Sequence, residues 1–390
     1  MTIGAAGHPK VTEFTRSPGM PRRGFSLPDN NPETGIDLRP VGLVQGDLAA
    51  NLCRDGGALP LAGGPFAFTA CEMFVAGTEG VTINFATLGD LTGWAEQTGP
   101  ATMRAISAKL DLLSRPRPDF AGMAVDRPRL MGIVNVTPDS FSDGGDFLDS
   151  DTAISHGREL VAAGADLLDI GGESTRPGSE PTSPDAELAR VLPVIAGLAD
   201  CGVPLSIDTR RGMVMDAALK SGVSVVNDIT ALGDDPDAPG IAARHGASVI
   251  LMHMLGRPRD MQVEPRYGHA PYEIMQFFKD RVAVCEQAGV PRDRIAVDPG
   301  IGFGKNDDHN LKILAEAAIF HGLGCAVVIG ASRKSFIGRV ADVDDARSRL
   351  AGSLAAAALA AGQGAQILRV HDVAETRQAL AILDGAFIGR

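Results

Sequence analysis

Polar residues end a series of apolar, strand-like runs in the C-terminal two thirds of the sequence. Seven of the eight runs finish in an ionisable or amide residue, even when His253 is set aside. A lone Asp in such a place usually caps the next helix, and capping alone would explain Asp228 and Asp372. Burying so many polar groups without partners would cost about 1–3 kcal/mol each, whereas a shared polar ligand would satisfy them. The seven are Asn135, Asp169, Asp208, Asn227, Asp298, Lys334 and Arg369.

One group of these side chains is suited to a heterocycle. Asp208, Asn227 and Asp298 supply hydrogen-bond donors and acceptors, and Lys334 adds a positive charge. A carboxylate accepts two adjacent donors, and an amide both donates and accepts. The edge of a 2-amino-4-oxo-pyrimidine ring presents such a pattern. The sequence therefore predicts a pocket for a ring of this kind.

A second group is suited to an anion. Asn135 follows the first run, and Arg369 and His371 come from the last, which would lie beside the first in a closed sheet. Arg clamps phosphate well, and Mg²⁺ prefers a few protein oxygens together with phosphate oxygens. Alone, Asn135 would be expected to cap a turn and His371 to form a hydrogen bond within the fold. Next to Arg369, a site for phosphate with a divalent cation is favoured.

Hydroxyl residues near two of the runs raise the alternative of a serine hydrolase. Ser174, Thr175 and Ser332 are the candidates. The sequence has no G-x-S-x-G motif there, and Ser332 lacks an orienting His–Asp partner, so ligand binding is favoured over hydrolysis. Met252 and Phe303 are expected to line the pocket or to belong to the core.

The elements that must position these residues alternate regularly between strand and helix. Eight strand–helix units in about 255 residues predict an α/β fold, a closed (β/α)8 TIM barrel, in which chemistry lies at the carboxyl ends of the strands. An open doubly wound sheet is the alternative, and the missing GxGxxG after the first strand argues against it. The strand-like runs are Leu130–Val136, Leu167–Gly171, Leu205–Thr209, Val223–Ile229, Ser248–His253, Ile295–Pro299, Ala326–Gly330 and Gln366–Val370. The helix-like segments are Thr152–Ala163, Asp185–Asp200, Arg211–Ser221, Pro239–His245, Pro271–Ala288, Leu311–Phe320, Asp345–Ala361 and Val373–Leu383.

The residues before the barrel divide into three parts. Residues 1–38 are rich in Pro, Gly, Arg and Asn and are expected to be poorly ordered. Residues 39–115 predict a small α+β extension, in which no set of catalytic residues converges. Residues 116–128 contain three prolines and are interpreted as a linker. The barrel is expected to span residues 129–390.

Composition restricts the partners and the compartment. The 390 residues carry a formal net charge of −12, which argues against binding to nucleic acid or to an anionic membrane. The five cysteines are scattered, odd in number and without metal-ligand spacing, so reduced thiols in a cytoplasmic protein are expected. The sequence shows neither a secretory signal nor an apolar run long enough to span a bilayer.

Together, the motifs around these strand ends resemble the dihydropteroate synthase family. They are MGIVNVTPDSFSDGG, DIGGESTRPG, SIDT, VNDI, MHMLGRP, DPGIGFGK, GASRKSFIG and RVHD, and they occur in order from residue 131. The family joins 6-hydroxymethyl-7,8-dihydropterin diphosphate to 4-aminobenzoate in folate biosynthesis and releases diphosphate with the help of Mg²⁺. Its members usually form homodimers and are the target of sulfonamides.

The resemblance also implies roles for individual residues. Asn135 would bind Mg²⁺, and the diphosphate or its approach would face Thr175, Arg369 and His371. Asp208, Asp298 and Lys334 would be catalytic. The pterin would be held by Asp208, Asn227, Asp298 and Lys334, with Met252 lining its pocket. The aminobenzoate side would be built by Arg176, Pro177, Phe303, Ser332 and Ser335, with the loop 137–145 closing over substrate through Phe141.

The sequence departs from the family in one respect, and two alternative functions stay open. About 125 residues precede the barrel, whereas family members often begin close to the first barrel strand. A pterin-dependent methyltransferase would share the barrel and the Asp–Asn grip on pterin, but it would need neither SRK nor RVHD. A binding protein with a decayed site is the other alternative, and the complete set of polar strand ends argues against it.

Overall fold

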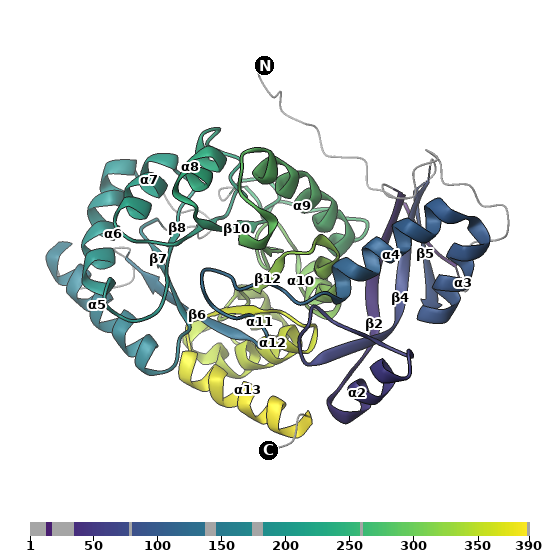
Figure 1. The fold of residues 1–390 in the computed structure, drawn as a ribbon. Helices are drawn as coiled ribbons and strands as arrows, with labels where there is room; N and C mark the ends of the chain where they lie inside the picture. The colour runs from purple at the N-terminus through teal and green to yellow at the C-terminus, as the bar shows by residue number, and fades with distance from the viewer. Residues whose placement is uncertain are drawn as a thin grey trace.

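The computed structural model describes residues 13–17, 35–77, 80–136, 146–173, 182–257 and 260–387. Eight parallel strands close into a barrel, in the order β10-β11-β12-β13-β6-β7-β8-β9 (Figure 1). The predicted (β/α)8 barrel is thereby confirmed, and the open sheet is wrong. The strands are β6 (Arg129–Asn135), β7 (Leu167–Gly171), β8 (Leu205–Asp208), β9 (Val225–Asp228), β10 (Ser248–Met252), β11 (Ile295–Asp298), β12 (Ala326–Ile329) and β13 (Ile367–Val370).

The barrel strands form from short runs of Val, Ile and Leu because both faces of the sheet are covered. Every residue of β7, β9, β10, β11 and β12 is buried. The register places Asp208 beside Gly171 on one side and beside Asn227 on the other. Met252 lies beside Asp298 in the same way. The polar strand ends therefore meet at one mouth of the barrel.

Helices cover the outside of the barrel between successive strands (Figure 1). The predicted helix Asp345–Ala361 is divided, because Asp345 accepts a hydrogen bond from the Ser348 amide at 3.0 Å and begins a 3-10 turn. Among the described residues, no helix has the length and apolar character needed to cross a membrane. The helices are α5 (Asp146–Ala162), α6 (Pro184–Leu198), α7 (Gly212–Lys220), α8 (Ala238–His245), α9 (Ala270–Gln287), α10 (Asp307–Glu316), α11 (Ser335–Ala341), α12 (Leu350–Gly362) and α13 (Val373–Phe387), with 3-10 turns η2 (Arg292–Arg294), η3 (Ala317–Leu323) and η4 (Ala346–Arg349).

The N-terminal extension is a mixed sheet with three helices. Its strands pair in the order β1-β5-β4-β2, and β3 pairs with β4. The expected lack of order in residues 1–38 is wrong at β1 and at the start of β2, because both strands gain backbone partners in the sheet; residues 1–12 and 18–34 lie outside the described residues. The elements are β1 (Phe14–Ser17), β2 (Ile36–Gln45), α2 (Gly46–Arg54), β3 (Leu59–Pro60), β4 (Phe66–Gly77), β5 (Gly80–Thr87), α3 (Leu88–Thr98) and α4 (Pro100–Ser114).

The extension packs against α9 on the outside of the barrel. Phe74 stacks on Tyr272 with ring centroids 5.0 Å apart. The buried carboxylate of Asp37 accepts hydrogen bonds from Lys279 at 2.6 Å and from Gln276 at 2.9 Å. Apolar and ionic contacts both fix the extension to this helix.

Residues 116–128 form no helix or strand of their own, but they are packed. The buried guanidinium of Arg117 donates to the carbonyl oxygens of His321 and Cys325, at 2.9 and 3.1 Å. Phe120 and Val125 share an apolar cluster with the first residues of several barrel strands. This segment therefore closes the amino-terminal mouth of the barrel, opposite the polar strand ends. The strand residues in the cluster include Leu167, Val225, Ala326 and Ile367.

Candidate active site

The predicted polar residues gather at the carboxyl-terminal mouth of the barrel. Asn135 ends β6, Asp208 ends β8 and Asp298 ends β11, while Lys334 and His371 follow β12 and β13. Thr175, Arg176, Pro177 and the loop 137–145 with Phe141 lie outside the described residues. The remaining predicted residues can be compared directly with their positions in the barrel.

Arg369 connects two carboxylates across the mouth of the barrel. Its Nε donates to Oδ2 of Asp169 at 2.6 Å, and an Nη donates to Oδ2 of Asp208 at 2.9 Å. The Asn227 amide donates to the same Asp169 oxygen at 3.0 Å. The sequence grouped Arg369 with Asn135 and His371, and the structure adds two partners, because the guanidinium also donates to the carboxylates of Asp169 and Asp208.

Burial raises the pKa values of the carboxylates at the mouth, and repulsion between neighbouring carboxylates adds to this effect at Asp208. Burial, and then the neighbouring charge of Asp169, raises the pKa of Asp208 to about 7, although Arg369 opposes the shift. Burial also raises the pKa of Asp298, against the opposing charge of Lys334. Near neutral pH, Asp208 can therefore be protonated or ionised. Such a carboxyl can donate to a ring nitrogen or accept from one.

Lys334 lies with Phe303 and Asp298 on one side of the mouth. Its Nζ is 4.7 Å from the centroid of the Phe303 ring and donates a hydrogen bond to the Ile301 carbonyl oxygen. Burial lowers the pKa of Lys334 to about 8, while Asp298 raises it. Asp298 itself accepts from the Gly300 amide at 2.8 Å. The structure thus brings together a cation, an aromatic face and a carboxylate.

The two C-terminal motifs are joined by side-chain contacts. Oγ of Ser332 lies 3.1 Å from Nδ1 of His371 and accepts from the His371 amide at 3.3 Å. Arg333 forms an ion pair with Asp372. Burial, and then the charge of Arg369, lowers the pKa of His371 to about 3, so its imidazole is neutral at physiological pH. It can therefore offer a hydrogen bond to an anion, but no charge.

Asn135 supplies an oxygen at the end of β6, the strand that pairs with β13. Its side chain is half-buried and has no hydrogen-bond partner among the described residues. A Cβ at Gly171 would lie 3.9 Å from Oδ1 of Asn135 and 3.5 Å from Cβ of Asp208, so glycine keeps the space between them open. An amide oxygen at such an opening suits Mg²⁺, which prefers oxygen ligands. No group of three or more His, Cys, Asp or Glu that could hold a metal occurs among the described residues.

The comparisons with known proteins identify the family of the barrel. Residues 131–371 match the family described as pterin binding enzyme. The chain is 45% identical to a dihydropteroate synthase of Neisseria meningitidis serogroup C over 261 residues, which is 66% of this chain and 92% of that protein. It is 44% identical to the Escherichia coli K12 dihydropteroate synthase over 261 residues, 67% of this chain and 92% of the relative.

Solved structures point in the same direction. The chain resembles the Xanthomonas albilineans dihydropteroate synthase with 4-aminobenzoic acid, at 45% identity and a TM-score of 0.65, over 70% of this chain and 98% of the other. It belongs to the dihydropteroate synthase family of pterin binding enzymes. A second structure of the Xanthomonas enzyme, in complex with 7,8-dihydropteroate, has 43% identity and a TM-score of 0.63, and it covers 70% of this chain and 98% of that one.

Sequence reasoning missed two parts of the site of this dihydropteroate synthase family member. Asp169 was noted as a strand end, but its position between Arg369 and Asn227 requires the barrel register. Lys305, the last residue of the motif DPGIGFGK, is the second. It is fully buried, and its Nζ donates to the carbonyl oxygens of Phe303 at 2.8 Å and His253 at 3.2 Å. A lysine inside the glycine-rich segment DPGIGFGK was the available signal.

Proposed function

We propose that the barrel joins 6-hydroxymethyl-7,8-dihydropterin diphosphate to 4-aminobenzoate, giving 7,8-dihydropteroate and diphosphate in folate biosynthesis. The reaction is an alkyl transfer. The observation that carries the proposal is the cluster of Asp169, Arg369, Asp208 and Asn227 at the barrel mouth. The dihydropteroate synthases to which the chain is similar, one of them solved with 7,8-dihydropteroate, support it.

The pterin is held by the carboxylates and amides of the barrel. Asp208 and Asp298 accept the ring N–H groups, and Asn227 both donates and accepts. The raised pKa of Asp208 suits a ring edge with donors and acceptors, because a single proton can lie on either side of the hydrogen bond. Met252, which lies beside Asp298 and is buried, forms the apolar wall.

The diphosphate lies between Asn135 on one side and Arg369 with His371 on the other. Asn135 would hold Mg²⁺, and Thr175 would contribute a hydroxyl to the diphosphate or its approach. When bound, Mg²⁺ neutralises negative charge on the leaving diphosphate. Arg369 adds a fixed positive charge, while neutral His371, oriented by Ser332, offers a hydrogen bond. An Asn135→Ala variant is expected to require more Mg²⁺ for half-maximal rate; an unchanged Mg²⁺ titration would contradict the metal role.

The aminobenzoate enters on the side of Lys334 and Phe303, and it is also served by Ser332, Ser335, Arg176 and Pro177. The Lys334 ammonium lies over the Phe303 ring, and this cation can bind the carboxylate of aminobenzoate or the pterin. As the C–O bond to diphosphate breaks, positive charge grows on the pterin methylene. The carboxylates of Asp208 and Asp298 stabilise that charge. The aminobenzoate nitrogen then forms the new C–N bond and loses a proton.

The test is diphosphate release by the full chain from the pterin diphosphate, with and without 4-aminobenzoate. Release that depends on aminobenzoate, with 7,8-dihydropteroate as product, is expected. A Yersinia pestis dihydropteroate synthase is solved with a sulfonamide drug, so a sulfonamide is expected to compete with aminobenzoate here. Methyl transfer to a corrinoid without diphosphate release would favour the methyltransferase alternative. The joined SRK and RVHD motifs argue against that alternative.

We further propose that the enzyme acts as a cytoplasmic homodimer. The five cysteines are free thiols, in keeping with a reducing compartment. The buried alanines of α12, among them Ala356 and Ala360, face the barrel, whereas Leu359 is 56% exposed on the outer side of the same helix. Sedimentation velocity tests the dimer: a single species with the mass of one chain at micromolar concentration would contradict it.

A further inference from the structure

Lys305 is a fully buried lysine to which the proposed reaction assigns no role. Its Nζ donates to the carbonyl oxygens of Phe303 at 2.8 Å and His253 at 3.2 Å, and it lies 3.0 Å from Nδ1 of His253. Burial, and then the charge of Lys334, lowers the pKa of Lys305 well below its usual range. A neutral amine can satisfy all three contacts, because two N–H groups donate to the carbonyl oxygens and the lone pair accepts from the imidazole. Lysine is rarely buried this completely, so the position calls for an explanation.

The segment 300–304, which contains Phe303, lies directly against the chain that follows β10. At Gly300, φ is +66° and a Cβ would lie 2.0 Å from the His253 carbonyl oxygen. At Gly304, φ is +64° and a Cβ would lie 2.3 Å from the Leu255 carbonyl oxygen. Glycine permits this close approach of two backbones. It also provides no side chain at these positions, so neighbouring residues have to hold the segment in place.

Side chains from outside the segment bind its backbone on both sides of Phe303. Asn310 of α10 accepts a hydrogen bond from the Gly302 amide at 2.7 Å. The Tyr267 hydroxyl, from the chain before α9, donates to the Gly304 carbonyl oxygen at 3.2 Å. Phe303 is the residue between these two glycines, and the buried lysine binds its carbonyl oxygen.

The pterin side of the mouth is held in a different way. Asp298 ends β11 and lies beside Met252 in the pairing of β10 with β11, so the barrel itself fixes both residues. Phe303 lies beyond the end of β11 and belongs to no strand. Its ring centroid is 4.7 Å from the Lys334 ammonium. The relative position of ring and ammonium therefore depends on the side chains that hold the segment 300–304.

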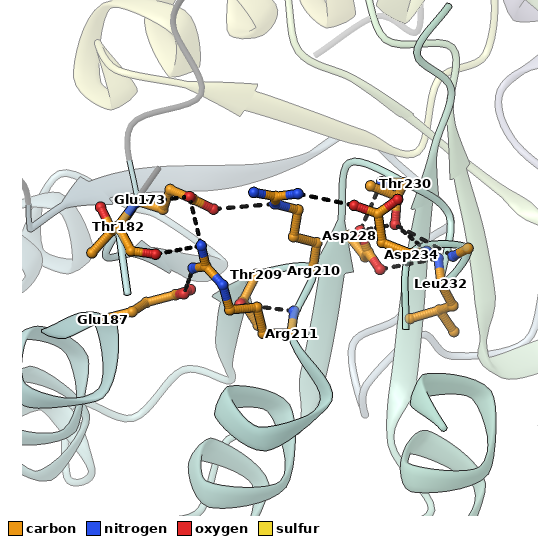
Figure 2. A network of polar contacts seen from close by, with 11 residues as sticks. Glu173, Thr182, Glu187, Thr209, Arg210, Arg211, Asp228, Thr230, Leu232 and Asp234 are labelled. Atoms are coloured by element: carbon orange, nitrogen blue, oxygen red, sulfur yellow. Dashed lines mark hydrogen bonds and ion pairs between the residues drawn. The ribbon is translucent and has the colours of Figure 1, made fainter. Parts of the chain in front are cut away.

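A second polar network joins other loops at the same mouth (Figure 2). Arg210, after β8, donates to Oε2 of Glu173 at 3.3 Å and to Asp234 at 2.9 Å. Glu173 follows β7 and Asp234 follows β9. None of the interactions drawn in Figure 2 reaches the segment 300–304. The contacts that hold Phe303 are separate from this network, which therefore supplies a control.

We propose that Lys305 is a positioning residue for the aminobenzoate side of the reaction, because it holds the backbone of Phe303 where the ring faces the Lys334 ammonium. The inference rests on the proposed function, in which Phe303 serves that substrate. Lys305 is buried beneath the segment and acts through Phe303 alone. Small displacements of positioning groups have large effects on rate and on substrate affinity.

The experiment compares Lys305→Met and Tyr267→Phe with the unmutated full chain. Methionine keeps an unbranched side chain but makes none of the three polar contacts. Lys305→Met is expected to raise the KM for aminobenzoate by about tenfold, while the KM for the pterin diphosphate stays within about twofold. Tyr267→Phe removes only the hydroxyl that binds the Gly304 carbonyl oxygen, and a smaller rise in the same KM is expected. This second variant decides the question if Lys305→Met does not fold.

Two control variants remove polar contacts elsewhere. Asp234→Ala breaks the contact with Arg210 at the same mouth (Figure 2). Arg158→Ala removes an exposed arginine that pairs with Asp200 on the helical exterior. Both KM values are expected to stay at those of the unmutated chain in each control.

Amide hydrogen exchange gives a readout that needs no activity. The Gly302 amide donates to Asn310, and the Phe303 amide donates to the Gly300 carbonyl oxygen at 3.1 Å, so both are protected in the unmutated chain. Peptides spanning residues 299–305 are expected to exchange faster in Lys305→Met than in either control. Peptides of β6 to β9 are expected to exchange at the same rate in all of these proteins.

The outcomes separate this inference from the proposed function. If the unmutated chain releases no diphosphate in response to aminobenzoate, the proposed function fails, and the exchange measurement still tests the hold on the segment. If the enzyme is active but Lys305→Met raises both KM values equally, or neither, the inference is overturned. An unchanged aminobenzoate KM in Tyr267→Phe overturns it where Lys305→Met does not fold. Unchanged exchange at residues 299–305 in a folded Lys305→Met overturns it as well.

Discussion

The Nζ of Lys305 lies 3.0 Å from Nδ1 of His253, and both side chains are buried. The lysine also donates to the carbonyl oxygens of His253 and Phe303. It therefore ties the loop after β11, which carries the Phe303 ring, to the end of β10. Burial is the largest cause that lowers the pKa of each group. The charge of Lys305 lowers the pKa of His253 further, and the charge of Lys334 does the same to the pKa of Lys305.

The buried lysine predicts a pH dependence of stability. Because the pKa of Lys305 is well below its ordinary 10.5 in the folded chain, the unfolded chain binds the extra proton between those two values. The free energy of unfolding that this group contributes therefore rises with pH through that window. Urea denaturation at pH 7 and pH 9 is expected to show a steeper gain for the unmutated chain than for Lys305→Met.

Lys220→Met is the matched control, because Lys220 is exposed and pairs with Asp216 one helical turn away. Its pH dependence is expected to follow that of the unmutated chain between pH 7 and pH 9. If Lys305→Met also runs parallel to the unmutated chain, the lysine is charged in the folded protein and the prediction is wrong.

For Asp208, the contribution to the free energy of unfolding is expected to change with pH in the opposite direction. Its pKa of about 7 in the folded chain exceeds the ordinary 3.8, so the folded chain binds more protons between these values. The stabilisation from this group is complete below pH 3.8 and is lost as pH rises through 7. Relative to Asp208→Asn, the unmutated chain is therefore expected to lose free energy of unfolding between pH 5 and pH 8. Equal slopes for the two proteins would contradict the raised pKa.

Removal of Arg369 is expected to lower the stability of the folded chain strongly. An Arg369→Met variant leaves the buried Asp169 and the partly buried Asp208 beside each other without their shared cation. Breaking a buried ion pair on one side typically costs about 3–5 kcal/mol of stability. Denaturant titration at pH 7 measures this loss. Adding Asp169→Asn to the variant is expected to restore part of the stability, whereas strictly additive losses would show that the two residues act independently.

The barrel and most of its polar rim could be predicted from the sequence because both depend on local pattern. Apolar runs define the strands, and Asn135, Asp208 and Asp298 are visible as polar residues where those runs end. The partners of Arg369 could not be predicted in the same way. Its contacts with Asp169 and Asp208 cross 200 and 161 residues of sequence, and only barrel closure brings those residues together.

The extension was harder to predict because its order comes from tertiary pairing. Phe14–Ser17 is a strand only through its register with β5, and the surrounding Pro- and Gly-rich sequence gives no local signal. Asp37 likewise looks like an ordinary polar residue, yet it is 2% exposed against α9. Propensity is a weak guide wherever such long-range contacts decide the structure.

Asp37 tests whether the extension supports stability without supporting catalysis. Asp37→Ala removes the acceptor for Lys279 and Gln276 at the surface where the extension meets α9. Losing charged hydrogen bonds of this kind is expected to cost about 1.5–3 kcal/mol of stability. The two KM values are expected to stay unchanged, because α9 lies outside the barrel mouth. A selective rise in either KM would instead assign the extension a role at the site.

Lys334 is expected to be indispensable to turnover. Its ammonium lies over the Phe303 ring, and its Coulombic interaction with Asp298 raises its pKa, so its removal takes the one lysine charge from the side where aminobenzoate is proposed to bind. Loss of one preorganised electrostatic group typically lowers kcat by about 100-fold or more. Aminobenzoate-dependent diphosphate release by Lys334→Ala measures this, with Arg158→Ala as the control for a lost surface charge. Because Lys334 is the N-cap of α11 without a side-chain cap bond, the substitution removes no helix-capping contact, and thermal unfolding is expected to change little. Full turnover by Lys334→Ala would therefore refute the assignment of this residue and could not be ascribed to compensating changes in stability.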